Sequence, residues 1–290
     1  SLNDILFSKD QCTLIWHPPK HPNQQYMIPS NVTTIESSAF YYCSNLTHIS
    51  VENGNSAFVS NDGILFSKDM QTLICYPCGH PNSIYNIPSS VTCISDFAFF
   101  YCLKLESITI PSSVTSIGNK VFVGCEKLKQ ISVEIGNSVF ASNDGILFTK
   151  DIQNLICYPR CHPNSKYDIP EGVTSIGDCS FYQCTSLVSI IIPSGVTSIG
   201  KSAFSHCTDL SSISLPSSVT SIGEFAFFHC SHLLSITIPS SVASIGNKVF
   251  EKCEKLKRIT VEPGNSAVVS NDGILFTKDM RNLICYPRCH

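Results

Sequence analysis

One phrase returns along the chain at a fixed spacing. An isoleucine or leucine followed by proline recurs at intervals of 59, 23, 59, 23, 23 and 23 residues. The prolines of this phrase are Pro29, Pro88, Pro111, Pro170, Pro193, Pro216 and Pro239. An aromatic-x-x-Cys phrase keeps the same rhythm. Self-similarity at a period of roughly 20 to 45 residues predicts a solenoid, whose repeats stack and share one continuous core.

The stretch LESITIPSSVTSIGNKVFVGC, residues 105–125, represents one repeat. Its residues 107–110 alternate polar and β-branched side chains, which predicts a short strand with Ile108 and Ile110 inward. Pro111 has no amide hydrogen and should end that strand. Each repeat should therefore add one strand to a parallel sheet.

The second half of the repeat should return to the core without a strand. Val114 and Ile117 are expected to point inward from a serine-rich turn. Gly118 should permit a change of chain direction. Residues 121–125 carry apolar side chains at i, i+1 and i+4, which favours a short helical turn with one face buried.

The 59-residue intervals hold one repeat plus an insert, and the insert is itself repeated. Its core, N-D-G-I-L-F followed by L-I-C-Y-P, begins at Asn61, Asn143 and Asn271, and a degenerate copy begins at Asn3. The apolar runs predict a β-hairpin, and Asn-Asp-Gly is a tight-turn signal. We expect the inserts to widen turns of one solenoid over 1–290 rather than to form separate domains. They lie near 1–27, 50–86, 132–168 and 260–290. The chain begins and ends inside repeats, which suggests a fragment of a longer array.

Many of the 16 cysteines occupy one slot of the repeat. A disulfide needs Cα atoms within about 7 Å, and a zinc site needs ligands that converge on one point. A column of thiols along the solenoid fits neither, whereas free cysteine behaves as a small buried apolar residue. We therefore expect these cysteines to fill the core: Cys43, Cys102, Cys125, Cys184, Cys207, Cys230 and Cys253.

The insert cysteines leave more than one interpretation open. Cys75 and Cys78 form a C-x-x-C beside His80, and Cys157 and Cys161 precede His162. These groups could hold a metal, act as a redox pair or form local disulfides. The simpler interpretation places the first cysteine of each insert inward on a strand and the second in an exposed loop. The inward set is Cys75, Cys157 and Cys285, and the exposed set is Cys78, Cys161 and Cys289.

The sequence contains no pattern typical of nucleic-acid binding, membrane insertion or catalysis. The formal net charge of −3 gives no basic field for nucleic acid, and no apolar run reaches the roughly 20 residues of a membrane span. No nucleophile elbow, phosphate-binding loop or zinc-protease motif is present. We therefore predict no catalytic residues, no metal and no cofactor. Histidines recur in H-P-N triplets and should serve turns: His21, His80, His162 and the truncated His290.

The pattern I-x-I-P-S-S-V-T-S-I-G-x-x-A-F-x-x-C-x-x-L resembles the BspA-like leucine-rich repeat, also called the Treponema pallidum-type leucine-rich repeat. The resemblance implies an α/β repeat solenoid: a right-handed curved rod with a parallel concave sheet, short helical turns on the convex side and hairpin-like inserts. It also implies a non-enzymatic protein-binding module, secreted or on the surface of a microbe, that adheres to a host-cell or matrix protein. An intracellular scaffolding protein is the alternative, consistent with many free cysteines.

Two sets of residues are expected to meet a partner. The outward positions of the strands present small hydroxyl groups, whereas the inserts add tyrosines, which interfaces favour. The expected contact residues are Thr109, Ile191, Ser214 and Thr237 on the strands and Tyr76, Tyr85, Tyr158 and Tyr167 in the inserts. Two sequons, at Asn31 and Asn45, would accept glycans in a eukaryotic secretory pathway.

Overall fold

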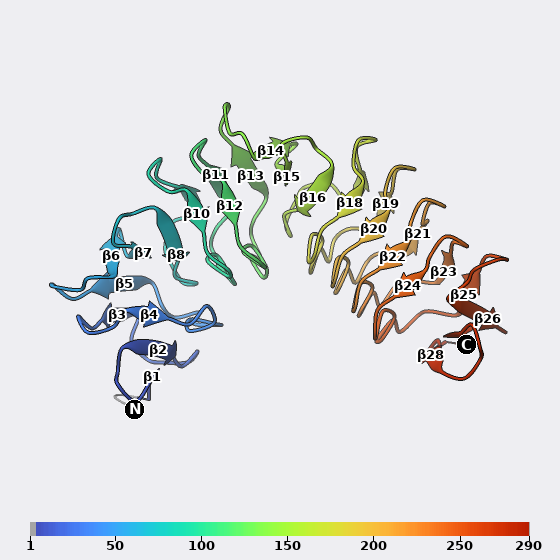
Figure 1. The fold of residues 1–290 in the computed structure, drawn as a ribbon, viewed down its shortest axis with the longest axis horizontal. Helices are drawn as coiled ribbons and strands as arrows, with labels where there is room; N and C mark the ends of the chain where they lie inside the picture. The colour runs from blue at the N-terminus through green and yellow to red at the C-terminus, as the bar shows by residue number, and fades with distance from the viewer. Residues whose placement is uncertain (1–3, 290) are drawn as a thin grey trace. The chain divides into compact units, whose positions relative to one another are not determined.

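The computed structural model describes residues 4–289 and divides into two units, Ser1–Phe140 and Ala141–His290, each described by itself. Within the described residues the regular elements are all strands, with no helix. Every repeat forms one coil of a β-solenoid, visible in Figure 1 as stacked turns of chain. The coils carry strands on two faces. We call one face proline-side, after the strands that lead into Ile-Pro or Leu-Pro, and the other glycine-side, after the strands that end directly before a glycine such as Gly118.

In unit 1 the proline-side sheets are β3-β5 and β9-β11-β13, and the glycine-side sheets are β1-β2-β4 and β6-β7-β8-β10-β12. The proline-side strands are β3 (Gln25–Ile28), β5 (His48–Val51), β9 (Ile84–Asn86), β11 (Ser107–Ile110) and β13 (Gln130–Val133). The other strands are β1 (Leu6–Phe7), β2 (Thr13–Trp16), β4 (Thr34–Ile35), β6 (Phe58–Asn61), β7 (Ile64–Ser67), β8 (Thr72–Cys75), β10 (Cys93–Ile94) and β12 (Ser116–Ile117).

Unit 2 repeats this arrangement. Its proline-side strands are β17 (Lys166–Asp168), β19 (Ser189–Ile191), β21 (Ser212–Ile213), β23 (Ser235–Ile238) and β25 (Arg258–Val261). Its other strands are β15 (Ile146–Thr149), β16 (Asn154–Cys157), β18 (Ser175–Ile176), β20 (Ser198–Ile199), β22 (Ser221–Ile222), β24 (Ser244–Ile245), β26 (Val268–Asn271), β27 (Ile274–Thr277) and β28 (Leu283–Cys285). The remaining strand, β14 (Phe140–Asn143), spans the division in the sequence.

The proline-side strands match the prediction from the repeat. β11 pairs in parallel with β13, and Ser107 lies opposite Gln130. Ile108 and Ile110 are fully buried, and the strand ends directly before Pro111. The alternating pattern was therefore sufficient to place this strand and its inward face.

A second parallel sheet forms where a serine-rich turn was expected. Ser116–Ile117 is the strand β12, which pairs in parallel with β10. Gly118 does not adopt a positive φ, so a change of direction is not its role. A Cβ on Gly118 would collide with the backbone nitrogen of Asp96 in the neighbouring coil. The glycine is therefore required by the close approach of two coils.

The predicted helical turn at residues 121–125 is wrong. From Phe97 onward, each such segment contains two residues with positive φ, four positions apart, such as Ser202 (53°) and His206 (62°). A non-glycine residue in this region cannot continue a right-handed helix. Backbone hydrogen bonds instead run to the next coil, from the Phe204 N–H to the Ala226 carbonyl at 2.8 Å. The segment is a stacked turn whose polar groups pair between coils.

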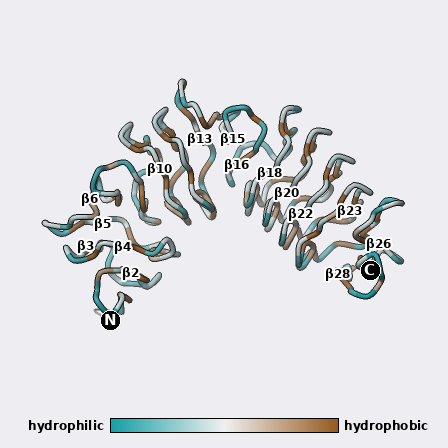
Figure 2. The backbone as a smooth tube through the Cα atoms, viewed as in Figure 1, coloured by the Kyte–Doolittle hydropathy of each residue, from teal (hydrophilic) through white to brown (hydrophobic). Residues whose placement is uncertain are grey.

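Phenylalanine and cysteine columns form the core between the sheets of unit 2. Successive rings of Phe181, Phe204 and Phe227 stack with centroids 4.9 and 5.3 Å apart. Cys207 donates its S–H to the Phe181 carbonyl at 3.0 Å, and Cys230 makes the same bond one coil later. All seven cysteines expected in this slot are buried, which confirms their core position. Figure 2 shows the resulting alternation of hydrophobic and hydrophilic stretches along the coils.

The insert hairpins are confirmed and are joined by a strand that was not expected. β7 pairs antiparallel with β8, and β6 pairs antiparallel with β7 through the turn at Asp62 and Gly63. Both turn residues have positive φ, 48° and 75°, as a type I′ turn requires. β8 then pairs in parallel with β10. Each insert thus extends the glycine-side sheet.

We predict that Phe204→Ala lowers the free energy of unfolding by about 3–5 kcal/mol, because it removes a fully buried ring from the column. Urea unfolding followed by circular dichroism measures the change. Ser212→Ala, on the exposed face of β21, is the matched control and should change it by about 0.5 kcal/mol or less. Equal effects of the two substitutions would contradict the ring column as the source of stability.

Candidate partner-binding surface

Five aromatic rings gather on one flank of unit 1. This aromatic patch consists of Tyr41, Tyr42, Phe97, Phe100 and Tyr101. The Tyr41 ring lies 4.6 Å from both Phe97 and Phe100, and the Tyr42 ring lies 4.6 Å from Tyr101. Tyr42 is 50% exposed, whereas Phe100 is buried beneath its neighbours. The patch therefore has a fixed aromatic base and an accessible outer ring.

The insert explains why these rings meet. Tyr41 and Phe100 occupy the same slot in two repeats that lie 59 residues apart, on either side of an insert. The insert segment 75–80 lies between them: the Gly79 N–H donates to the Leu46 carbonyl, and the Leu103 N–H donates to the Cys78 carbonyl. This segment carries no bulky side chain in the slot, so the two flanking rings close over it.

A small pocket of about 120 Å³ lies at the base of the patch. Tyr41, Phe97 and Phe100 line it together with the carboxylates of Glu36 and Asp96. Burial raises the pKa of Tyr41, and the negative charge of Asp96 raises it further. The Tyr41 hydroxyl therefore stays protonated and can donate a hydrogen bond beside two acidic groups.

A second hollowed surface follows the glycine-side sheet of unit 2. A shallow groove of about 690 Å³ runs across β16, β18, β20, β22 and β24. Rows of serine and glycine line it, and the Ser198 hydroxyl donates to the Ser175 hydroxyl at 3.0 Å. Asp178, Lys201 and Glu224 place alternating charges along one edge. Such a surface offers hydroxyl groups to a partner but lacks the tryptophan, tyrosine and arginine side chains that dominate interface energies.

The strand residues expected to meet a partner lie on the other sheet. Ile191 is 62% exposed, Ser214 and Thr237 are exposed, and Thr109 is half-buried. All four belong to the proline-side face, whereas the groove lies on the glycine-side face. Their role in binding stays a prediction.

The insert tyrosines lie differently from the expectation. Tyr76, Tyr158 and Tyr167 are buried, and Tyr85 is half-buried. Tyr76 stacks on Phe99 at 5.2 Å, and Tyr158 stacks on Phe181 at 5.0 Å. Tyr76 and Tyr158 thus extend the phenylalanine column into the insert coils. A role of the four insert tyrosines in binding stays a prediction.

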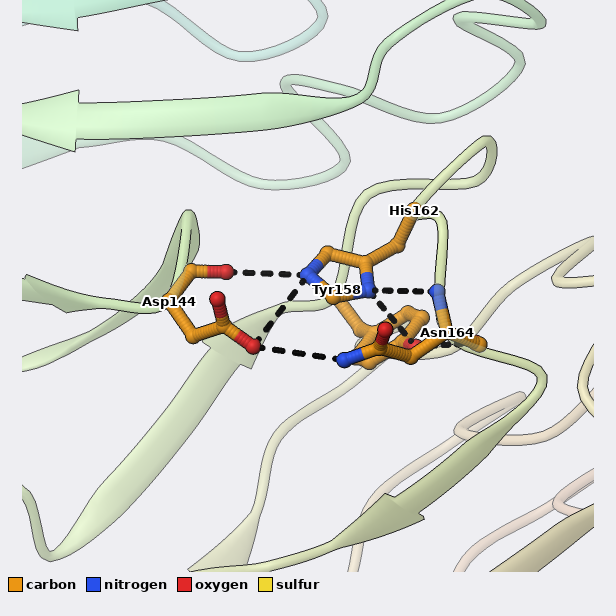
Figure 3. Close-up of polar contacts among 4 residues, drawn as sticks. All are labelled: Asp144, Tyr158, His162 and Asn164. Atoms are coloured by element: carbon orange, nitrogen blue, oxygen red, sulfur yellow. Dashed lines mark hydrogen bonds and ion pairs between the residues drawn. The ribbon is translucent and has the colours of Figure 1, made fainter.

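The insert histidines hold the tip of the neighbouring hairpin turn. His162 donates from Nε2 to the Asp144 carbonyl at 2.9 Å, and its Nδ1 accepts the Asn164 N–H at 3.3 Å (Figure 3). The Tyr158 hydroxyl lies 3.0 Å from the same Nδ1 and donates to the Asn164 carbonyl. His80 repeats the bond to the Asp62 carbonyl. The turn role is confirmed for both histidines, whereas His290 lies outside the described residues.

The insert cysteines follow the simpler interpretation except at one position. Cys161 and Cys289 are exposed as expected, but Cys78 is buried and donates to the Phe100 carbonyl at 3.2 Å. The prediction that Cys78 is exposed was wrong. The coil that follows covers this residue. Cys75 is buried, whereas Cys157 and Cys285 are half-buried. The seven cysteines of the core column and the exposed Cys161 and Cys289 are free thiols.

Three further observations bound the chemistry of the described residues. Between residues 4 and 289, no three histidine, cysteine or acidic side chains gather closely enough to hold a metal. Nor does that part of the chain contain a helix of the length and apolarity that a membrane crossing requires. Asn31 and Asn45 are exposed, and the Asn31 amide donates to the Gln11 carbonyl. Glycosylation of these asparagines stays a prediction.

Comparisons with known proteins agree with the repeat pattern. A family model for the BspA type leucine rich repeat region matches in six copies, over residues 22–65, 76–154 and 150–272. Among solved structures, the pneumococcal vaccine antigen PcpA is 27% identical at a TM-score of 0.63, covering 85% of this chain and 52% of that chain. The chain thus spans about half of that antigen.

A second solved structure supports the fold alone. A leucine rich cell surface protein from Faecalibacterium prausnitzii A2-165 is 23% identical at a TM-score of 0.51, covering 94% of this chain and 85% of that chain. Comparison with curated proteins finds no match.

Thiol reactivity should separate the core column from the loops. Burial raises the pKa of the Cys207 and Cys230 thiols well above the usual range. Because the thiolate is the reactive form, these two thiols should react slowly. We expect iodoacetamide to label Cys161 and Cys289 in the native chain, and Cys207 and Cys230 only after denaturation. Mass spectrometry of the labelled peptides measures this. Native labelling of the column at the rate of Cys161 would contradict its burial.

Substituting His162 should loosen the hairpin turn. His162→Phe keeps the ring but leaves the Asp144 carbonyl unpaired, and we expect a loss of about 1–3 kcal/mol in the free energy of unfolding. Hydrogen exchange at the Gly145 amide should also become faster. His232→Phe, at an exposed position, is the control. Unchanged exchange in His162→Phe would show that the turn holds without the histidine.

Proposed function

Because the chain belongs to the BspA-type leucine-rich repeat family, we propose that it is a non-enzymatic protein-binding module on, or secreted from, a microbial cell. The similarity to a pneumococcal vaccine antigen supports display outside the cell. The regular coils act as a rigid support, and the irregular positions of the repeat provide the contacts. The partner is a host-cell or matrix protein, and the role is adhesion.

The aromatic patch is the observation that carries this proposal. Hot spots of protein interfaces favour tyrosine, and their rings lie in well-packed surroundings. Tyr42 presents such a ring, held against Phe100 at 5.3 Å and Tyr101 at 4.6 Å. A ring that is already held in place loses little conformational entropy when a partner covers it.

The charges around the patch define the partner's side of the contact. Glu36 and Asp96 line the pocket beside Tyr41, and no lysine or arginine lines it with them. A lysine or arginine of the partner could pair with these carboxylates and lie against the aromatic rings. The patch therefore suits a basic segment of a protein. The groove of unit 2 would add weak contacts, which accumulate when many copies are displayed on one surface.

An intracellular scaffold is the second candidate, and the free thiols favour it. The free thiols of the core column and of the exposed Cys161 and Cys289 suit a reducing compartment, whereas extracellular proteins commonly oxidise theirs to disulfides. Limited protease treatment of intact source cells decides between the two candidates. Loss of the protein from intact cells supports display on the surface. Complete protection, with loss only after lysis, supports the scaffold.

We predict that the double substitution Tyr42→Ala and Tyr101→Ala weakens binding to epithelial cells and to immobilised extracellular matrix proteins by about 30-fold or more, the effect of losing a hot spot of about 2 kcal/mol. Saturation binding of the labelled chain measures the affinity. Tyr286→Ala removes an exposed tyrosine outside the patch and should leave the affinity unchanged. Ser221→Arg fills the groove of unit 2 and should have a weaker effect.

Circular dichroism should confirm that each variant is folded. If wild-type binding is saturable and only Ser221→Arg abolishes it, the groove and not the patch is the contact surface. If the wild-type chain binds none of these targets at micromolar concentration, the adhesive role is wrong for this part of the protein.

A further inference from the structure

One slot of the stacked turns places two histidines in direct contact. Gln183, His206, His229 and Lys252 each precede a buried cysteine, 23 residues apart, in four successive coils of unit 2. All four residues have positive φ, between 57° and 62°. Their side chains therefore leave the backbone in the same way and form a column. Within it, Nδ1 of His206 lies 2.9 Å from Nδ1 of His229.

The backbone and the neighbouring rings hold this pair in place. The His206 N–H donates to the Phe228 carbonyl at 2.7 Å, and the His229 N–H donates to the Glu251 carbonyl at 2.8 Å. The Tyr182 ring lies 5.6 Å from the His206 ring on one side, and the Phe228 ring lies 5.4 Å from it. Both histidines are half-buried, so an ion can reach them from solvent.

The spacing of the two nitrogens fits a particular coordination geometry. Metal–imidazole bonds are about 2.0–2.1 Å long, so two ligands at a right angle lie about 2.9 Å apart, and two tetrahedral ligands lie about 3.3 Å apart. The observed 2.9 Å is the length of a hydrogen bond between the two rings, and it is also the separation of neighbouring ligands on a square-planar or tetragonal ion. Nitrogen ligands in that geometry are typical of Cu²⁺ and Ni²⁺.

The protonation state also suits a metal. Two nitrogens at 2.9 Å share one hydrogen when both rings are neutral, and protonating both would place two N–H donors against each other. Burial lowers the pKa of His206, and the charges of His229, Lys252 and Arg160 lower it further. Metal binding needs neutral imidazole, the form in which a ring nitrogen offers its lone pair.

The nearby cations are themselves engaged. The Lys252 ammonium lies over the Phe228 ring at 5.2 Å, and Arg160 donates to the Gln183 side chain at 3.1 Å. Their charges still oppose a divalent ion, which favours the metal with the strongest imidazole bonds, Cu²⁺ in the Irving–Williams order. We propose that His206 and His229 bind one Cu²⁺ or Ni²⁺ ion, with water completing the coordination. The site does not depend on the proposed adhesive function.

Titration of the untagged chain with NiCl₂ tests the site, after alkylation of its accessible thiols to prevent their competition. His206→Gln and His229→Gln are suitable variants because glutamine already fills this slot at position 183. His232→Gln, at an exposed histidine in the same coil as His229, is the matched control. We expect one ion per chain by calorimetry, at least a tenfold loss of affinity in either variant, and no change in the control.

A parallel titration with CuCl₂ should give tighter binding than NiCl₂ or ZnCl₂, and electron paramagnetic resonance should show coupling of the copper to two nitrogens. Loss of that coupling in both variants supports the pair as the ligands. Equal nickel binding in the wild-type chain and both variants would overturn the proposal. Tighter binding of Zn²⁺ than of Cu²⁺ would also overturn it, because the ligands would then not hold the right-angle geometry.

Discussion

Hydrogen bonding between equivalent residues of successive coils is the constraint on which the structure depends. In unit 2, Ser198 pairs with Ser221 on the glycine-side sheet, and Ser189 pairs with Ser212 on the proline-side sheet. The turns follow the same 23-residue register, from the Phe204 N–H to the Ala226 carbonyl. Each coil satisfies its backbone through its neighbours, so a slot in one coil lies directly over the same slot in the next. Columns of like side chains are the necessary result.

This register separates the slots that the core restricts from those that can vary. Phe204 and Cys207 fill slots closed on all sides, where a change of volume is costly. The two positions between them carry different residues in different coils, and the second of them, as at His206, is partly exposed. Both unusual surfaces arise there: the aromatic patch around Tyr41 and Tyr42, and the histidine pair of unit 2. Chemistry that needs two side chains within 5 Å can arise from two coils without any new backbone geometry.

The sequence predicted the solenoid, the proline-side strands, the cysteine column and the insert hairpins, because each depends on a periodic pattern. The sequence was misleading where the backbone conformation, and not the spacing of apolar residues, determines the local structure, and where a strand is very short. Apolar spacing at residues 121–125 suits a helix, but positive φ at Lys120 and Gly124 excludes one. A two-residue strand such as Ser116–Ile117 is too short for alternation to reveal. Tyr76 could have been assigned to the core, since it precedes Phe99 by the repeat length of 23 residues.

The aromatic patch exists because an insert coil stands where a regular coil would otherwise lie. The insert keeps the strand and the buried aromatic slot, as β8 and Tyr76 show, but the turn that joins them, from Leu73 to Tyr76, is two residues shorter than the regular turn from Ile94 to Phe99. Regular turns would keep Tyr41 and Phe100 two coils apart, whereas the shortened turn lets their rings meet at 4.6 Å. The insert has a cost in stability, because holding its hairpin removes polar side chains from water. His80, for example, is buried and bonded to the Asp62 carbonyl. An array of identical coils would be simpler to stabilise but would offer only uniform columns. Interruption of the repeat is what gives this solenoid a distinctive surface.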